Sequence, residues 1–193
     1  MLERAAPMAD KALAARRRAK PYRMIAEHLQ EADLAGIQIG QLLVEQGVLT
    51  EAQVGHILKV QKMSNRPFGD LAERLFGVDA QAVEDAWVEQ YVRTTGVIDL
   101  EEQRIDTDCL RLLNRRQAWQ FHLLPLNRQD ADLHMATSPQ DLVRAVNFSG
   151  RKVNEPVNFL IAERAQLKEF LMKHYPVPEY FARYAASLAA VNR

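Results

Sequence analysis

The segment QIGQLLVEQGVLTEAQVGHILKVQ, residues 38–61, is followed at residues 67–90 by PFGDLAERLFGVDAQAVEDAWVEQ, which has the same length and a similar order of apolar positions. The two copies are offset by 29 residues, and the five residues 62–66 separate them. Each copy is typical of a short apolar helix, a turn and a second amphipathic helix that ends in Gln. Helices of this length are marginal alone in water, so the copies are expected to bury their apolar faces on each other.

Turn and capping residues predict where these helices end. Gly47 stands where the first helix is expected to end in a left-handed residue. Thr50 and Gln53 have the spacing of a capping box, and Asp79 occupies the equivalent N-cap position in the second copy. Residues on the core-facing side of each second helix follow a spacing of three and four: Val54, Ile57, Leu58 and Gln61, then Val83, Ala86, Trp87 and Gln90.

After about residue 93 the pattern changes from helical to mixed. Alternating apolar residues predict strands, and the sequence Ser138-Pro139 predicts a helix start, because Ser is a favoured N-cap and Pro a favoured first helical residue. In chain order we expect a short strand at 97–100, a helix at 106–119, a hairpin of 121–126 and 133–137 around a polar loop at 127–130, a helix from Ser138 to about Gly150, a strand at 157–161 and a closing helix at 163–174.

The expected fold class is therefore α+β: a helical bundle of two tandem helix-pair repeats, followed by a small mixed α/β sandwich subdomain. The chain has 193 residues, 48% of them hydrophobic, which is enough for one domain or two small ones. We predict four segments: a basic helical arm at 1–35, the tandem-repeat subdomain at 36–92, the α+β subdomain at 93–176 and an aromatic helical tail at 177–193.

Charge and cysteine content exclude several classes of protein. Acidic and basic residues are equal in number, which argues against general nucleic-acid affinity. Residues 1–23 carry seven Lys or Arg against two acidic residues, so the remaining chain is net acidic. Cys109 is the single cysteine, so no disulfide forms within the chain. No apolar run reaches the length of a membrane span, and the N-terminus lacks the apolar segment of a signal peptide, so we expect a cytoplasmic protein.

No residue pattern points to catalysis or to a metal site. The five histidines are scattered without Glu or Cys at ligand spacing. Cys109 is next to Leu110 on an expected helix face and has no adjacent basic residue, so it is expected in the core. A glycine-rich phosphate loop is also missing, since Gly150-Arg151-Lys152 lacks the upstream glycine. We therefore expect a protein that is not an enzyme, with no metal and no cofactor.

The repeat, its capped helix pairs, the phrase His122-Leu-Leu-Pro-Leu126 and the strand followed by Ser138-Pro139 resemble the N-terminal regulatory domain of the ATPases that drive type II secretion and type IV pilus assembly. The resemblance covers about residues 36–176 and does not include a motor domain. It implies a domain that binds a partner and couples a motor to a membrane-anchored component.

In a subset of that family the paired repeats are similar to a receptor for cyclic di-GMP, in which each copy begins Arg-Leu-Gly, contains an internal Gly and ends in Gln. Because this ligand is two-fold symmetric, two half-sites suit it. A glycine in such a site permits close backbone approach. The resemblance implies these ligand-binding candidates: Gln38, Ile39, Gly40, Leu43, Gly47, Leu58, Gln61, Arg66, Phe68, Gly69, Trp87 and Gln90.

The sequence departs from that pattern at its charged positions. The opening Arg is replaced by Gln38 in the first copy and by Pro67 in the second, and Arg66 stands one position before Pro67. An Arg there stacks on guanine and opposes phosphate charge, which neither replacement does. The second copy also has Phe76 at the position of the internal Gly, with Gly77 one place later.

Three functions stay open on the sequence. The first is a non-catalytic cytoplasmic regulatory or adaptor protein whose bundle and α+β subdomain bind another protein, in which case it could reach the membrane through that partner. The second is a cyclic di-GMP receptor that uses the repeats as half-sites, and the third is an accessory structural subunit of a larger assembly. Candidate partner-binding residues are the basic run and the aromatic tail: Arg16, Arg17, Arg18, Tyr180, Phe181 and Tyr184.

Overall fold

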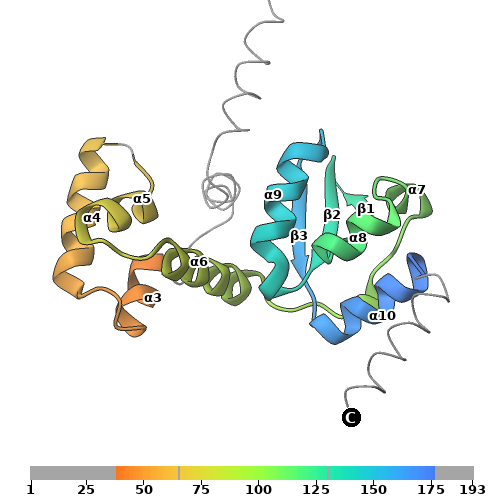
Figure 1. The fold of residues 1–193 in the computed structure, drawn as a ribbon, viewed down its shortest axis with the longest axis horizontal. Helices are drawn as coiled ribbons and strands as arrows, with labels where there is room; N and C mark the ends of the chain where they lie inside the picture. Colours follow the sequence, from red (N-terminus) through yellow and green to blue (C-terminus); the bar gives the residue numbers. More distant parts are fainter. Residues whose placement is uncertain (1–37, 65, 130, 177–193) are drawn as a thin grey trace, which may run out of the picture. The chain divides into compact units, whose positions relative to one another are not determined.

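The computed structural model describes residues 38–64, 66–129 and 131–176 (Figure 1). The predicted arm at 1–35, the tail at 177–193 and the six candidate partner-binding residues lie outside them. The described residues form two compact units. Unit 1 contains the residues up to Gly96 and the segment Leu142–Asn154, and unit 2 contains Val97–Asp141 and the residues from Glu155 onward. The predicted class, helical repeats with a small mixed subdomain, is confirmed.

Unit 1 contains the tandem repeat. Its helices are α3 (Ile39–Glu45), α4 (Glu51–Ser64), α5 (Phe68–Phe76), α6 (Ala80–Thr95) and α9 (Leu142–Lys152). The first helix of each copy packs mainly on the second helix of the other copy, so α3 lies on α6 and α5 lies on α4 (Figure 1). The two copies thus share one core, as expected for helices that are too short to be stable alone. The core is formed by Leu42, Leu43, Leu49, Ile57, Phe68, Leu71, Ala72, Val78, Val83 and Ala86.

The predicted caps of the repeat helices are confirmed. The Thr50 hydroxyl accepts from the Gln53 backbone N–H at 3.3 Å, and the Gln53 side chain accepts from the Thr50 N–H at 2.8 Å. The Asp79 carboxylate accepts from the backbone N–H of Gln81 at 3.3 Å. These bonds satisfy N–H groups that have no partner within the helix.

The two copies differ at the end of their first helix. Gly47 has φ +70°, as predicted, and the chain leaves α3 through it. In the second copy α5 continues to Phe76 and ends at Gly77, which has φ +65°. Because only glycine adopts this conformation at little cost, the shifted glycine lengthens α5 relative to α3. The following turns still match, since the N–H of Leu49 bonds the carbonyl of Leu43 and the N–H of Val78 bonds that of Ala72.

Unit 2 is built on a three-stranded sheet. Its strands are β1 (Leu124–Gln129), β2 (Asp132–Thr137) and β3 (Val157–Ile161), in the order β1-β2-β3. The pair β1 and β2 is the predicted hairpin, with Leu124 opposite Ala136, and β3 runs parallel to β2. A parallel pair needs a crossover connection, which the chain makes through the 3-10 helix η2 (Pro139–Asp141) and α9. The remaining helices of the unit are η1 (Leu100–Glu102), α7 (Thr107–Leu110), α8 (Arg115–Phe121) and α10 (Arg164–His174), and α10 contacts β1 and β2.

Several predicted boundaries after Gly96 are wrong. The helix predicted at 106–119 is two helices, because Asn114 forms a capping box with Gln117 and starts α8. The strand predicted at 97–100 is a single bridge between Ile98 and Ala162, followed by η1. The polar loop predicted at 127–130 is largely strand, because β1 continues to Gln129. The helix expected from Ser138 begins as η2, and α9 ends at Lys152, close to the expected end near Gly150.

Candidate functional site

The candidate residues of the first repeat divide into a buried and an exposed group. Gly40 and Leu43 are buried in α3, and Ile39 is partly buried. Gln38 is the exposed N-cap residue of α3, and Gly47 is exposed in the following turn. On α4, Gln61 is partly buried and Leu58 is 37% exposed. The first repeat therefore offers Gln38, Gly47, Leu58 and Gln61 to an external molecule, whereas Gly40 and Leu43 face the core.

Gly40 lies at a crossing of three helices. A Cβ added there would be 2.9 Å from Cγ1 of Val54 on α4, and 3.1 Å from Cζ of Phe68 on α5. Side chains do not pack at 2.9 Å, so this position accepts glycine and no larger residue without a shift. The space left by the missing Cβ is occupied by side chains of the protein itself, Val54 and Phe68.

The candidate residues of the second repeat lie mainly in the core. Phe68 and Gly69 are buried in α5, and Trp87 and Gln90 are buried in α6, with 3% and 8% of their surface exposed. The Trp87 ring packs against Tyr91 with 5.8 Å between centroids. Its indole N–H is buried without a hydrogen-bond partner among the described residues, an unsatisfied donor that ordinarily costs about 1 to 3 kcal/mol.

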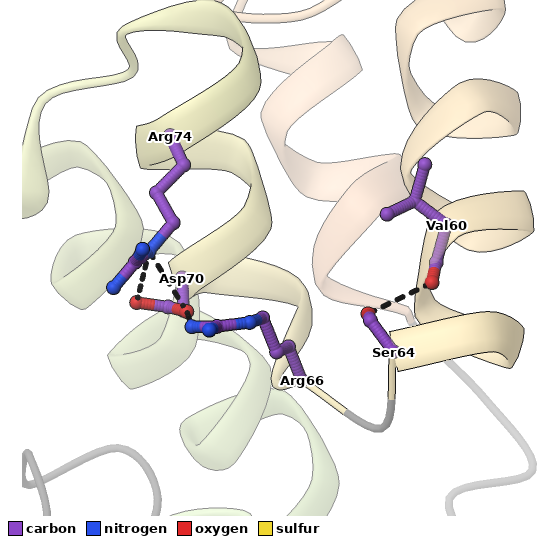
Figure 2. Close-up of polar contacts among 5 residues, drawn as sticks. All are labelled: Val60, Ser64, Arg66, Asp70 and Arg74. Carbon is purple, nitrogen blue, oxygen red and sulfur yellow. Dashed lines mark hydrogen bonds and ion pairs between the residues drawn. The ribbon is translucent and has the colours of Figure 1, made fainter.

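Arg66 is held by an ion pair at the start of α5. Its Nη1 atom is 3.0 Å from Oδ2 of Asp70, and Nε of Arg74 is 3.2 Å from the same carboxylate (Figure 2). Burial of Asp70 disfavours its charged form, but the hydrogen bonds and charges of the two guanidinium groups outweigh burial and lower its pKa. Asp70 is therefore ionised at neutral pH, and Arg66 is engaged with it. A guanidinium held in this way would have to leave the carboxylate before stacking on a ligand.

A buried polar cluster in unit 2 is not predicted by any sequence pattern. The Asp141 carboxylate, 3% exposed, accepts from the Ser138 hydroxyl at 2.7 Å and lies 3.1 Å from Nδ1 of His122. Nε of Arg164 is 3.8 Å away. His122 ends α8 with φ +44°, and its carbonyl accepts from the Thr137 hydroxyl at 3.0 Å. The only sequence signal was Ser138 with Asp141 three residues later, which indicates a helix start and does not identify His122.

The cluster does not have the geometry of a nucleophilic site. In a serine hydrolase the histidine lies between the serine and the carboxylate, because it must take the hydroxyl proton. Here Asp141 lies between Ser138 and His122, and the Ser138 side chain is buried. A strained left-handed residue persists where its surroundings fix it, so these bonds stabilise the connection from α8 to β1 and the start of η2.

A second polar cluster joins β1 to the start of β3. Arg128 forms a bidentate pair with Glu155 at 2.7 and 2.9 Å, and its Nη1 also donates to Sγ of Cys109 at 3.4 Å. The hydrogen bonds from Arg128 lower the pKa of Glu155 and outweigh its partial burial. Cys109 is 1% exposed, so its predicted place in the core is confirmed. Burial raises the pKa of the Cys109 thiol above its ordinary value, which keeps the thiol protonated and unreactive at neutral pH.

Over the described ranges, no group of three or more His, Cys, Asp or Glu side chains is arranged to hold a metal ion. None of the helices in these ranges is long and apolar enough to cross a membrane.

Comparison with solved structures gives matches to MshE and to the N-terminal domain of XpsE. A structure described as MshE with cdg has 28% sequence identity and a TM-score of 0.41, and the match covers 72% of this chain and all of that one. Two crystal forms of the N-terminal domain of XpsE have 17% and 19% identity, with TM-scores of 0.33 and 0.35. These matches cover 71% and 91% of this chain, and 92% and 99% of the XpsE chains.

The family comparison gives one match. Residues 93–180 match the family model of the MshEN domain, whereas no curated protein matches the chain. The matched range begins after the tandem repeats and contains the sheet of unit 2. Over residues 93–180 the match confirms the resemblance to the N-terminal domains of the ATPases that drive type II secretion and type IV pilus assembly.

Proposed function

We propose that the chain is a non-catalytic regulatory or adaptor protein that binds another protein through its repeat bundle. The observation that carries this proposal is the burial of the motif residues, because Gly40, Leu43, Phe68, Gly69, Trp87 and Gln90 are all buried. Side chains that are buried in this way contribute primarily to the stability of the fold. The one arginine near the expected cation position, Arg66, is paired with Asp70.

Exposed apolar residues on the repeat helices support protein recognition. Met63 at the end of α4 is 89% exposed, and Leu75 on α5 is 42% exposed. Large apolar side chains in water are favourable sites for contact with another protein, since their burial contributes about 1.5 to 3 kcal/mol for each side chain. The bundle therefore offers apolar anchors to a protein partner.

A site-specific photo-crosslinker tests this proposal directly. Benzoylphenylalanine replaces Met63 in the full chain, which is then expressed in the cells that make it, and cross-linked products are identified by mass spectrometry. We expect one specific protein partner at Met63 and none when the same group replaces exposed Glu101 in unit 2. Absence of a cross-link at Met63, with the protein folded and expressed, would contradict an adaptor that uses the bundle.

The basic segment provides a second test of the same proposal. Residues 1–23 carry seven Lys or Arg against two acidic residues in a chain whose net charge is zero, and charges in contact with solvent are screened by salt. If they help to bind an acidic partner, association with the cross-linked protein weakens as salt rises, and deletion of the segment removes that salt dependence. A small-molecule sensor has no need of the segment.

Cyclic di-GMP is the ligand of a second candidate function. The copy length, the five-residue spacer and the partly exposed Gln61 beside the exposed Leu58 favour it. The missing arginines oppose it, because each charge-assisted contact is worth about 1.5 to 3 kcal/mol. The test is calorimetric titration of the purified chain with cyclic di-GMP, alongside Gln61→Ala. Binding at micromolar concentration that Gln61→Ala loses would establish a receptor, and no heat at high micromolar ligand would exclude one.

A further inference from the structure

Helix α4 buries fewer of its residues than α6, the equivalent helix of the second repeat. Of its 14 residues only Ile57 is fully buried, whereas α6 buries Val83, Ala86, Trp87, Gln90 and Tyr91. The equivalent residues Leu58 and Trp87 show the difference, with 37% and 3% of their surface exposed. One side of α4 is thus left without a partner among the described residues.

This side contains a stripe of four residues: Glu51, Gly55, Leu58 and Lys62. Spacings of four, three and four place them on a single helix face. Glu51 and Lys62 are exposed and form no ion pair within the described residues. A Cβ added to Gly55 would meet no atom within 4 Å, so no described neighbour explains this glycine. A glycine inside a helix costs about 1 kcal/mol relative to alanine, which makes its presence here informative.

The stripe is complementary to itself in an antiparallel pair. A two-fold axis at the midpoint between residues 56 and 57 places Glu51 opposite Lys62 and Gly55 opposite Leu58. Each leucine then enters the gap above the other chain's glycine, where the helices can approach closely. Opposite charges meet at both ends of the contact, and the helix dipoles are antiparallel. A partner of unrelated sequence would not require this symmetry.

We propose that a second copy of this chain binds the α4 stripe, so that the protein forms a two-fold symmetric dimer through antiparallel α4 helices. One helix face from each copy is an interface at the small end of the known range, so we expect a weak dimer that forms at high protein concentration. The dimer is independent of the adaptor proposal, because the crosslinking partner at Met63 can be absent while the chain still self-associates.

Sedimentation velocity of the full chain over a range of concentrations tests the dimer, with Gly55→Leu as the decisive variant. A leucine side chain fills the gap that the partner's Leu58 needs. A Cβ at this position meets no described atom within 4 Å, and leucine favours the helix over glycine. We expect Gly55→Leu to stay monomeric at concentrations where the native chain is largely dimeric, and to melt at the same or a higher temperature. Unchanged association of this variant, or a native chain that is monomeric throughout, would overturn the proposal.

Charge reversal identifies the register of the two helices. Glu51→Lys and Lys62→Glu are each expected to weaken self-association tenfold or more, because like charges then face each other at both ends. An equimolar mixture of the two variants restores opposite charges in both pairs, so it should dimerise like the native chain. Glu101→Lys and Lys168→Glu, exposed in unit 2, change the net charge equally and serve as controls. Failure of the mixture to dimerise would refute the antiparallel register.

Discussion

Gly40→Ala should destabilise unit 1, although alanine is the better helix former. The added Cβ would be 2.9 Å from the partly buried Val54 and 3.1 Å from the buried Phe68. Overpacking of this kind costs about 1 to 3 kcal/mol, and the gain in helix propensity offsets up to about 1 kcal/mol. The expected net loss in the free energy of unfolding is about 1 kcal/mol.

Gly55→Ala is a matched control, because it makes the same change within a helix where the added Cβ meets nothing within 4 Å. It should stabilise the unit by about 0.5 to 1 kcal/mol. The two variants should therefore differ by about 2 kcal/mol, with opposite signs relative to the native chain. Equal effects of the two substitutions would show that Val54 and Phe68 do not enclose Gly40.

Urea unfolding at low protein concentration is the assay, with tryptophan fluorescence as the probe. The chain has two tryptophans, Trp87 in unit 1 and Trp119 in unit 2, so a Trp119→Phe background leaves a signal from unit 1 alone. A local probe is needed because a chain with two units does not have to unfold in a single step. The stability difference follows from the shift in midpoint at an unchanged slope.

Three further predictions concern unit 2. Asn114→Ala removes the capping box of α8 and should lower the free energy of unfolding by about 1 kcal/mol, measured by Trp119 fluorescence. Glu155→Gln loses the half-exposed pair with Arg128, worth about 0.5 to 1 kcal/mol near neutral pH. Because the pKa of Glu155 is lowered in the folded state, this difference from the native chain should disappear as pH falls through that pKa. Burial raises the pKa of Tyr175 to about 12, so tyrosinate absorbance at 295 nm should show a late titration step that Tyr175→Phe removes, provided the fold survives to that pH.

Local capping chemistry explains why the repeat helices were predictable. Thr50 with Gln53, and Asp79, satisfy N–H groups within three residues of themselves, so the sequence alone contains the partners. The same chemistry was missed at Asn114, because apolar residues lie on both sides of the break: Leu110 and Leu113 before it, and Trp119 after it. Periodicity indicates which face is buried, and it does not show where one helix ends and the next begins.

Contacts between distant residues account for most of the errors in unit 2. Asn127 is polar and suggests a loop, yet it is buried in β1, where its side chain donates to the carbonyl of Arg104 at 2.8 Å. The next residue, Arg128, forms an ion pair with Glu155, which lies 27 positions later. The Asn127 amide N–H and the Arg128 guanidinium each donate to a residue distant in the sequence, so local composition predicted a loop where the chain forms a strand. The contact between His122 and Asp141 could not be predicted from the sequence for the same reason.

The glycines of the repeat show why the candidate ligand site could not be judged from the sequence. Glycine is needed at such a position whether a ligand or a neighbouring helix lies close to it. The sequence is therefore the same in both cases. The structure separates the two cases by what occupies the space of the missing Cβ. At Gly40 that space is filled by Val54 and Phe68, which makes the glycine a requirement of the core. At Gly55, which the ligand motif does not include, the space is open and Leu58 lies one turn further on the same face. The motif glycine Gly47 is also open, but its φ of +70° already requires glycine for the turn after α3, so the symmetric stripe on α4 is the surface to test first.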